Sequence, residues 1–261
     1  LIRTKLIKHH FTLFLNIAVS ISASCFIYAA LLKIAEMAFN VSTIHEAGYI
    51  CSMLFIIPGF PFITSGIDLA KLDLRSGLER LAYAIIIVMV ATMFAWIMAL
   101  LLRLQPMDFE DLNLTPVLHL ILRLIMSFFG VFGFSIMFNS PAPMAATAAL
   151  IGSIANSLRL ELVDLTGMPA PAAAFAGALT AGLLASFIKQ NNGYPRISLT
   201  VPSIVIMVPG LYLYRAIYNF GIMALSDAVS WFASAIMIII ALPLGLIFAR
   251  ILTDKTFRYC T

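Results

Sequence analysis

The sequence predicts an all-α integral membrane protein of about eight transmembrane helices, arranged as the inverted repeat seen in many transporters. Three observations support this fold class. Of the 261 residues, 62% are hydrophobic and only 11% are charged, whereas soluble proteins carry about 25% charged residues. The apolar residues form runs close to the ~20 residues that a helix needs to cross the bilayer. Two of these runs contain the same dipeptide, at Pro58-Gly59 and at Pro209-Gly210.

The predicted spans follow the apolar runs along the chain. They lie near residues 11–35, 46–68, 79–102, 118–138, 143–158, 170–189, 198–220 and 227–252. The segment 143–158 is short and rich in alanine, so a tilted span and a re-entrant segment are both compatible with it. The topology below assumes that this segment crosses the membrane.

The cations between the spans predict the orientation of the chain. With a cytoplasmic N-terminus, 11 cations lie inside and 4 outside, with Arg123 set aside because it falls within a span. The inner set is Arg3, Lys5, Lys8, Lys71, Arg75, Arg80, Lys189, Arg196, Arg250, Lys255 and Arg258, and the outer set is Lys33, Arg103, Arg159 and Arg215. Loops rich in Lys and Arg stay in the cytoplasm, so we expect both termini there. The net charge of +4 is therefore a signal of topology, and we expect no nucleic-acid partner.

An offset of 151 residues places Pro58-Gly59 on Pro209-Gly210 and superimposes the spans around them. Five spans separate equivalent positions, and an odd number reverses the direction of the chain, so the halves are predicted to be inverted repeats. We expect an incomplete first repeat of three spans (1–103), an acidic extracytoplasmic linker (104–116) and a second repeat of five spans (117–261). The first repeat lacks two spans, so a fragment, a second subunit or a homo-oligomer is expected.

The two Pro-Gly dipeptides are the first candidates for a substrate site. Proline removes a helix hydrogen bond and glycine adds backbone freedom, so both helices are predicted to break. A matched pair of interrupted helices is the best sequence pointer to the substrate site of a secondary transporter. The freed amides and carbonyls of Pro58, Gly59, Pro209 and Gly210 would then face a small zwitterion in one polar cavity. The alternative is a pair of kinks that only shape packing.

Polar side chains near the breaks extend this candidate site. Thr64, Ser65 and Asp68 follow the first break, and Asp68 could hold a substrate ammonium or carry a proton, or it could lie at the interface and cap a helix end. Arg215 could clamp a carboxylate or extend to the outer headgroups. Asn139 could line the cavity, or it could bond neighbouring helices.

Five stretches carry a resemblance to a known family. They are IPGFPFITSGIDL (57–69) with SGLERL (76–81), and VPGLYLYRAI (208–217) preceded by Tyr194-Pro195 and by VPS (201–203). In this combination they resemble the two membrane halves of the threonine/serine exporter (ThrE) family. The resemblance covers most of residues 45–250, and it adds Tyr212 to the candidate substrate-binding residues.

The resemblance implies a ten-span exporter of the bacterial inner membrane, in one chain or two subunits, that moves small amino acids with the proton gradient. Some split relatives are linked to dicarboxylate export, so a succinate-like substrate is an alternative. A non-transporting membrane subunit of a larger complex is the other alternative. No His-Glu-x-x-His, Gly-x-Ser-x-Gly or phosphate-binding glycine motif is present. We therefore expect no enzyme activity, cofactor or metal, and only a small-molecule substrate and membrane lipid as further partners.

Overall fold

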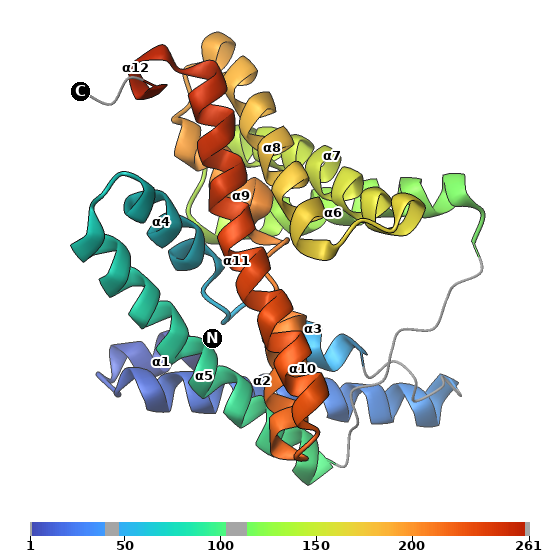
Figure 1. The fold of residues 1–261 in the computed structure, drawn as a ribbon. Coiled ribbons are helices and arrows are strands. Elements are labelled where there is room, and N and C mark those ends of the chain that lie inside the picture. The colour runs from blue at the N-terminus through green and yellow to red at the C-terminus, as the bar shows by residue number, and fades with distance from the viewer. Residues whose placement is uncertain (1, 40–46, 103–113, 259–261) are drawn as a thin grey trace. The chain divides into compact units, whose positions relative to one another are not determined.

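The computed structural model describes residues 2–39, 47–102 and 114–258, and every element in these ranges is a helix (Figure 1). The helices are α1 (Ile2–Lys8), α2 (Leu13–Phe39), α3 (Ala47–Met53), α4 (Gly59–Ala70), α5 (Leu74–Leu102), α6 (Pro116–Met137), α7 (Ala142–Thr166), α8 (Ala170–Asn192), α9 (Arg196–Val205), α10 (Gly210–Gly221), α11 (Leu225–Thr253) and α12 (Lys255–Arg258). The all-α prediction is confirmed.

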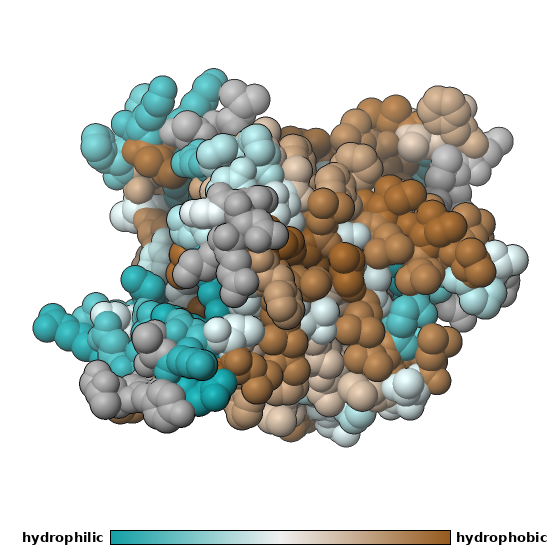
Figure 2. Space-filling view, turned by 90° about the horizontal axis from the view of Figure 1, so that it is seen from above, coloured by the Kyte–Doolittle hydropathy of each residue, from teal (hydrophilic) through white to brown (hydrophobic). Residues whose placement is uncertain are grey.

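Five of the described helices are long and apolar enough to cross a membrane, namely α2, α5, α6, α11 and the Ala170–Ile188 part of α8. The pair α9 and α10 adds a sixth if both halves belong to one span. Large apolar side chains such as Met126 and Phe129 are exposed, and hydrophobic residues cover much of the face in Figure 2. The expected number of eight remains a prediction that depends on α7 and on the pair α3 and α4.

Helix α7 is longer than the predicted segment 143–158. It runs for 25 residues and ends at Gly167, whose φ of 65° is left-handed and suits a residue without a side chain. The extension carries Arg159, Glu161 and Asp164 on helical backbone. These charges lower the hydropathy of α7, which explains why its apolar run looked short.

The chain folds into two compact units, each built from three segments. Unit 1 comprises Leu1–Pro58, Ala82–Leu112 and Gly210–Ala235, and unit 2 comprises Gly59–Leu81, Asn113–Pro209 and Ile236–Thr261. The chain passes between units within both Pro-Gly dipeptides and within α5 and α11. Half-helix α10 therefore belongs to the unit of α3, and α4 belongs to the unit of α9. The predicted division at 104–116 falls largely on residues outside the described ranges, and the repeat boundaries remain a prediction.

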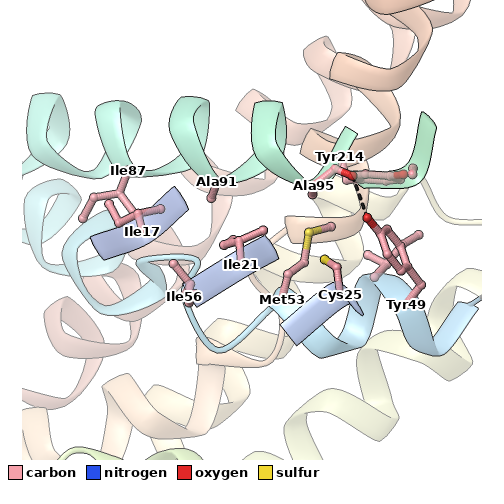
Figure 3. Packing of buried hydrophobic residues seen from close by; sticks show 12 residues of the cluster. Ile17, Ile21, Cys25, Tyr49, Met53, Ile56, Ile87, Ala91, Ala95 and Tyr214 are labelled. Carbon is pink, nitrogen blue, oxygen red and sulfur yellow. Dashed lines mark hydrogen bonds between the residues drawn. The ribbon is translucent and has the colours of Figure 1, made fainter. Parts of the chain in front are cut away.

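The core of unit 1 forms where α2 and α3 pack on a face of small residues on α5. Ala91, Ala95 and Ala99 recur every four residues and are fully buried. In Figure 3 the side chains of α2 and α3 point toward this face. The Tyr49 hydroxyl donates to the Ala95 carbonyl at 2.6 Å. Small residues let membrane helices approach closely, which replaces the hydrophobic drive that lipid cannot supply.

The core of unit 2 forms around α7, which contacts α6, α8 and α9. A Cβ on Gly152 would lie 2.7 Å from the Ser203 carbonyl oxygen and 2.7 Å from a Val131 methyl group. The Ser203 hydroxyl donates to the Ala148 carbonyl at 2.8 Å. Glycine at position 152 therefore permits α9 to lie directly on α7.

The 151-residue offset reappears in the helix bounds. Helix α4 corresponds to α10 over its whole length, and α5 corresponds to α11 over its whole length. The turns that follow α4 and α10 also agree, because Leu72 (φ 63°) and Met223 (φ 62°) are both left-handed and occupy equivalent positions. The match between residues 59–102 and 210–253 thus extends from the Pro-Gly dipeptides to local backbone conformation.

We expect Gly152→Ala to lower the free energy of unfolding by about 1–3 kcal/mol, because its Cβ meets the backbone of α9. Gly133→Ala is the matched control on α6, since its Cβ meets nothing within 4 Å, and it should be neutral or stabilise by up to about 1 kcal/mol. Thermal unfolding of the two variants in detergent measures the difference. Equal stability of both variants would contradict the close α7–α9 contact.

Candidate functional site

The first break lies between α3 and α4. Helix α3 ends in two tight turns, in which the Ile56 N–H donates to the Met53 carbonyl at 3.0 Å and the Ile57 N–H to the Leu54 carbonyl at 3.2 Å. Pro58 follows and has no N–H to continue the pattern. The α-helical hydrogen bonds therefore stop at this point and start again in α4.

The second break, between α9 and α10, repeats this geometry. The Met207 N–H donates to the Ile204 carbonyl at 2.9 Å and the Val208 N–H to the Val205 carbonyl at 3.2 Å. Pro209 then interrupts the pattern as Pro58 does. Both breaks predicted from the sequence are confirmed as helix interruptions, and they share one backbone conformation.

Two half-helices begin at these breaks, α4 at Gly59 and α10 at Gly210. The N–H groups of a first helical turn have no partner within their helix, and they carry a positive partial charge of about half a unit. Gly59 and Gly210 are both buried, and N–H groups of this kind are suited to a carboxylate that reaches them. The carbonyls at the ends of α3 and α9 accept the N–H groups of the tight turns. Each carbonyl oxygen keeps a second lone pair, which is suited to an ammonium group.

In unit 2, Gly59 packs against the chain that enters the second break. A Cβ at Gly59 would lie 2.5 Å from the Val205 Cγ2 atom and 3.2 Å from the Val208 Cγ2 atom. A side chain at position 59 would thus collide with Val205, whose branched side chain has little rotamer freedom. The first helical residue of α4 has to be glycine for this approach.

In unit 1, Gly210 packs against the chain that enters the first break. Its Cβ would lie 2.5 Å from the Leu54 Cδ2 atom and 2.8 Å from the Ile57 Cδ1 atom. Leu54 and Ile57 are equivalent by the 151-residue offset to the two valines that contact Gly59. Each glycine therefore packs on the residues that precede the other proline.

Thr64 and Ser65 are buried on α4, and their hydroxyls are engaged by their own helix. The Thr64 hydroxyl donates to the Phe60 carbonyl at 3.0 Å, and the Ser65 hydroxyl donates to the Phe62 carbonyl at 2.9 Å. Each hydroxyl oxygen keeps lone pairs that can accept a hydrogen bond. Both residues stay candidates as acceptors for a substrate ammonium.

Asp68 lies near the far end of α4 and pairs with Arg80 on α5. The Arg80 Nη1 atom is 2.7 Å from the Asp68 Oδ2 atom, and the Arg80 and Asp68 side chains are 51% and 18% exposed. Nine residues separate Asp68 from Gly59, which at 1.5 Å per residue is roughly 14 Å along the helix. One amino-acid substrate cannot reach both, so Asp68 does not share a binding site with the first turn of α4.

Arg215 and Tyr212 on α10 both contact Trp231. The Arg215 guanidinium lies 4.7 Å from the Trp231 ring centroid, and the Tyr212 ring meets the same indole edge-on at 5.3 Å. Arg215 is equivalent by the 151-residue offset to Thr64, and each lies five residues into its half-helix. The indole holds Arg215 in place on the surface of α10.

Asn139 lies in the turn between α6 and α7. It is exposed and left-handed, with a φ of 59°, and its N–H donates to the Ile136 carbonyl at 2.9 Å. The preceding Phe138 packs against Phe60 in the first turn of α4, with ring centroids 5.4 Å apart. Asn139 is therefore a neighbour of the first break through Phe138, and its role as a cavity residue stays a prediction.

The sequence did not reveal the partners of the charged residues. Arg123 is 14% exposed and contacts two carboxylates of α7, Glu161 at 2.7 Å and Asp164. Both carboxylates are distant from Arg123 in the sequence. Asn156 on α7 and Ser127 on α6 are a second distant pair, in which the Asn156 amide donates to the Ser127 hydroxyl at 2.8 Å. Helical spacing could have suggested only that Glu161 and Asp164 share a face.

The apolar helices and their interruptions define a multi-pass membrane protein. A family model described as "Threonine/Serine exporter, ThrE" matches residues 123–252, and one described as "Putative threonine/serine exporter" matches residues 1–102. The chain belongs to the threonine/serine exporter family, so the resemblance noted in the sequence is confirmed. Neither a curated protein nor a solved structure is significantly similar to the chain.

We expect Asp68→Asn to lower stability by on the order of 1 kcal/mol, because the pair with Arg80 is only partly exposed. The exchange Asp68→Arg with Arg80→Asp should recover most of that stability, since it rebuilds the pair. If Asp68 also handles protons, the exchanged variant unfolds like the wild type but does not transport. Recovery of both stability and transport would make Asp68 a purely structural residue.

Proposed function

We propose that this protein is a secondary transporter that exports threonine, serine and similar small amino acids across the bacterial inner membrane. The observation that supports this most directly is the pair of half-helices that start at Gly59 and Gly210, each packed on the chain that enters the other break. Membership of the exporter family supports the same class of substrate.

The binding chemistry follows from the two ends of a zwitterion. The substrate carboxylate accepts hydrogen bonds from first-turn N–H groups of α4 or α10, where the helix dipole favours an anion. The ammonium donates to backbone carbonyls of the half-helix in the same unit, which is α9 for a carboxylate held by α4 and α3 for a carboxylate held by α10. The Thr64 oxygen is a further acceptor beside α4. Thr64 and Arg215 lie five residues, or roughly 8 Å, inside the half-helices, so either can contact the substrate side chain.

Asp68 acts in coupling, at a distance from the bound amino acid. The Arg80 Nη1 atom lies 2.7 Å from the Asp68 Oδ2 atom, and this contact joins the end of α4 to α5. A coupling proton delivered to Asp68 from one side of the membrane would remove the charge that Arg80 contacts, and so change how firmly the end of α4 is held to α5. This gives the proton gradient a place to act without direct contact between proton and substrate.

The two halves are, we propose, inverted repeats. The matched bounds of α4 with α10 and α5 with α11 support this relation, as do the exchanged contacts of the two glycines. Under the same offset α3 corresponds to part of α9. The relation gives each half one broken helix, as transporters with a central substrate site have.

Closing the first break should abolish export. In Pro58→Ala with Gly59→Ala the helix can continue, and Val205→Ala removes the methyl group that the new side chain at position 59 would strike. We expect this triple variant to insert into the membrane at wild-type levels and to lose efflux of labelled threonine and serine at least roughly tenfold, a barrier change of about 1.4 kcal/mol. The matched control is Val205→Ala alone, which should retain efflux.

Wild-type efflux by the triple variant would mean that the break is only a packing kink. Parallel measurements with labelled succinate distinguish amino-acid export from dicarboxylate export, because a dicarboxylate exporter moves succinate and not threonine. Transport of none of the three substrates by the intact chain would favour a non-transporting subunit.

Both termini should lie in the cytoplasm, given the excess of cations on that side. A reporter that is active only outside the cytoplasm should stay inactive when fused after Thr261, and it should be active when inserted after Gly167. The second position also tests whether α7 crosses the membrane. Activity after Thr261 would refute the orientation, and inactivity after Gly167 would remove α7 from the spans.

A further inference from the structure

Unit 2 contains a cavity of about 310 Å³ where the ends of three helices meet. Lys71 follows α4, Arg196 is the first residue of α9, and Arg250 lies in the last turn of α11. All three cations line the cavity, together with Asp254, and Ile197 and Phe257 are among its apolar residues. The wall therefore carries three positive charges and one negative charge.

The contacts of the three cations leave two of the positive charges, those of Lys71 and Arg196, without an ion pair among the described residues. Arg250 pairs with Asp254 at 3.4 Å and lies over the Phe257 ring at 4.1 Å. Lys71 is exposed and makes no ion pair within the described residues.

Arg196 is held by neutral acceptors, the Thr253 hydroxyl at 3.0 Å and the Gly182 carbonyl at 3.2 Å. These two bonds fix its guanidinium beside the cavity without neutralising it. An arginine held in this way presents a planar set of donors that matches a phosphate group.

The cavity also has an apolar rim, which is formed by the lining residues Ile67, Ile197, Leu246, Ile247 and Phe257. Ile197 follows Arg196 and is 49% exposed. A small hydrophilic anion gains no contact energy from this apolar rim. An amphipathic anion contacts the cations with its headgroup and the apolar rim with its hydrocarbon chains.

We propose that this cavity binds the phosphate group of an anionic phospholipid, with the acyl chains along the apolar rim. Basic pockets between membrane helices at the cytoplasmic surface are suited to such headgroups. The site belongs to one half only, because the positions equivalent to Lys71 and Arg250 by the 151-residue offset are Ile222 and Ala99. It is therefore separate from the repeated breaks, and its test needs no transport.

The test uses the purified chain in neutral detergent, with lipid retention measured by native mass spectrometry. Phosphatidylglycerol should bind in preference to phosphatidylcholine. Lys71→Gln should weaken its binding about fivefold, the effect of one cation near a charged headgroup, and Arg250→Gln should do so independently. Lys71→Arg should bind normally. Arg75→Gln is the matched control, because Arg75 is 91% exposed near Lys71, pairs with Glu79 and does not line the cavity.

Three outcomes would overturn the proposal. Equal retention of phosphatidylglycerol by Lys71→Gln and Arg75→Gln would remove the cavity from lipid binding. Equal affinity for phosphatidylcholine would mean that the cations do not select the headgroup. Displacement of phosphatidylglycerol by an equal concentration of inorganic phosphate would make the cavity a site for small anions.

Discussion

The packing of glycine against the facing break is the contact on which the rest of this structure depends. A backbone whose hydrogen bonds are interrupted costs several kcal/mol per group if it faces lipid, so protein has to cover it. Here Gly59 is covered by Val205 and Val208, and Gly210 by Leu54 and Ile57. The absence of a Cβ at both positions makes the cover possible. These contacts place the start of each half-helix directly against the chain that enters the other break.

The two units solve the problem of helix association in the same way. Lipid is as apolar as leucine, so burial of large side chains provides little drive between helices. Small residues take over this function, in unit 1 on the buried alanine face of α5 and in unit 2 around Gly152 on α7. Hydroxyls such as that of Ser203 then bond across the helices. The result is a scaffold with close backbone contacts within each unit.

The charged side chains are matched to partners on neighbouring helices. Arg123 meets carboxylates of α7, Asp68 meets Arg80, and Arg215 lies over Trp231. An isolated charge within a membrane is costly, so a partner on a neighbouring helix lowers that cost. The cavity near Lys71 departs from this pattern because its cations outnumber its carboxylates, which is why a ligand is proposed there and not at the paired sites.

The sequence by itself determined most of the long helices, both breaks and the offset that relates them. These features are local, because hydropathy, proline and glycine act on the chain within a few residues, and the bounds of α4 and α10 agree with the 151-residue offset throughout. Family membership could be inferred for the same reason, because the motifs that indicate it are short and lie around Pro58 and Pro209. Only the tertiary structure decided that α4 packs in the unit of α9 and α10 in the unit of α3. Arg80 as the partner of Asp68 and Trp231 as the partner of Arg215 were likewise visible only in the tertiary structure. Such partners depend on how separate helices pack and not on neighbouring residues.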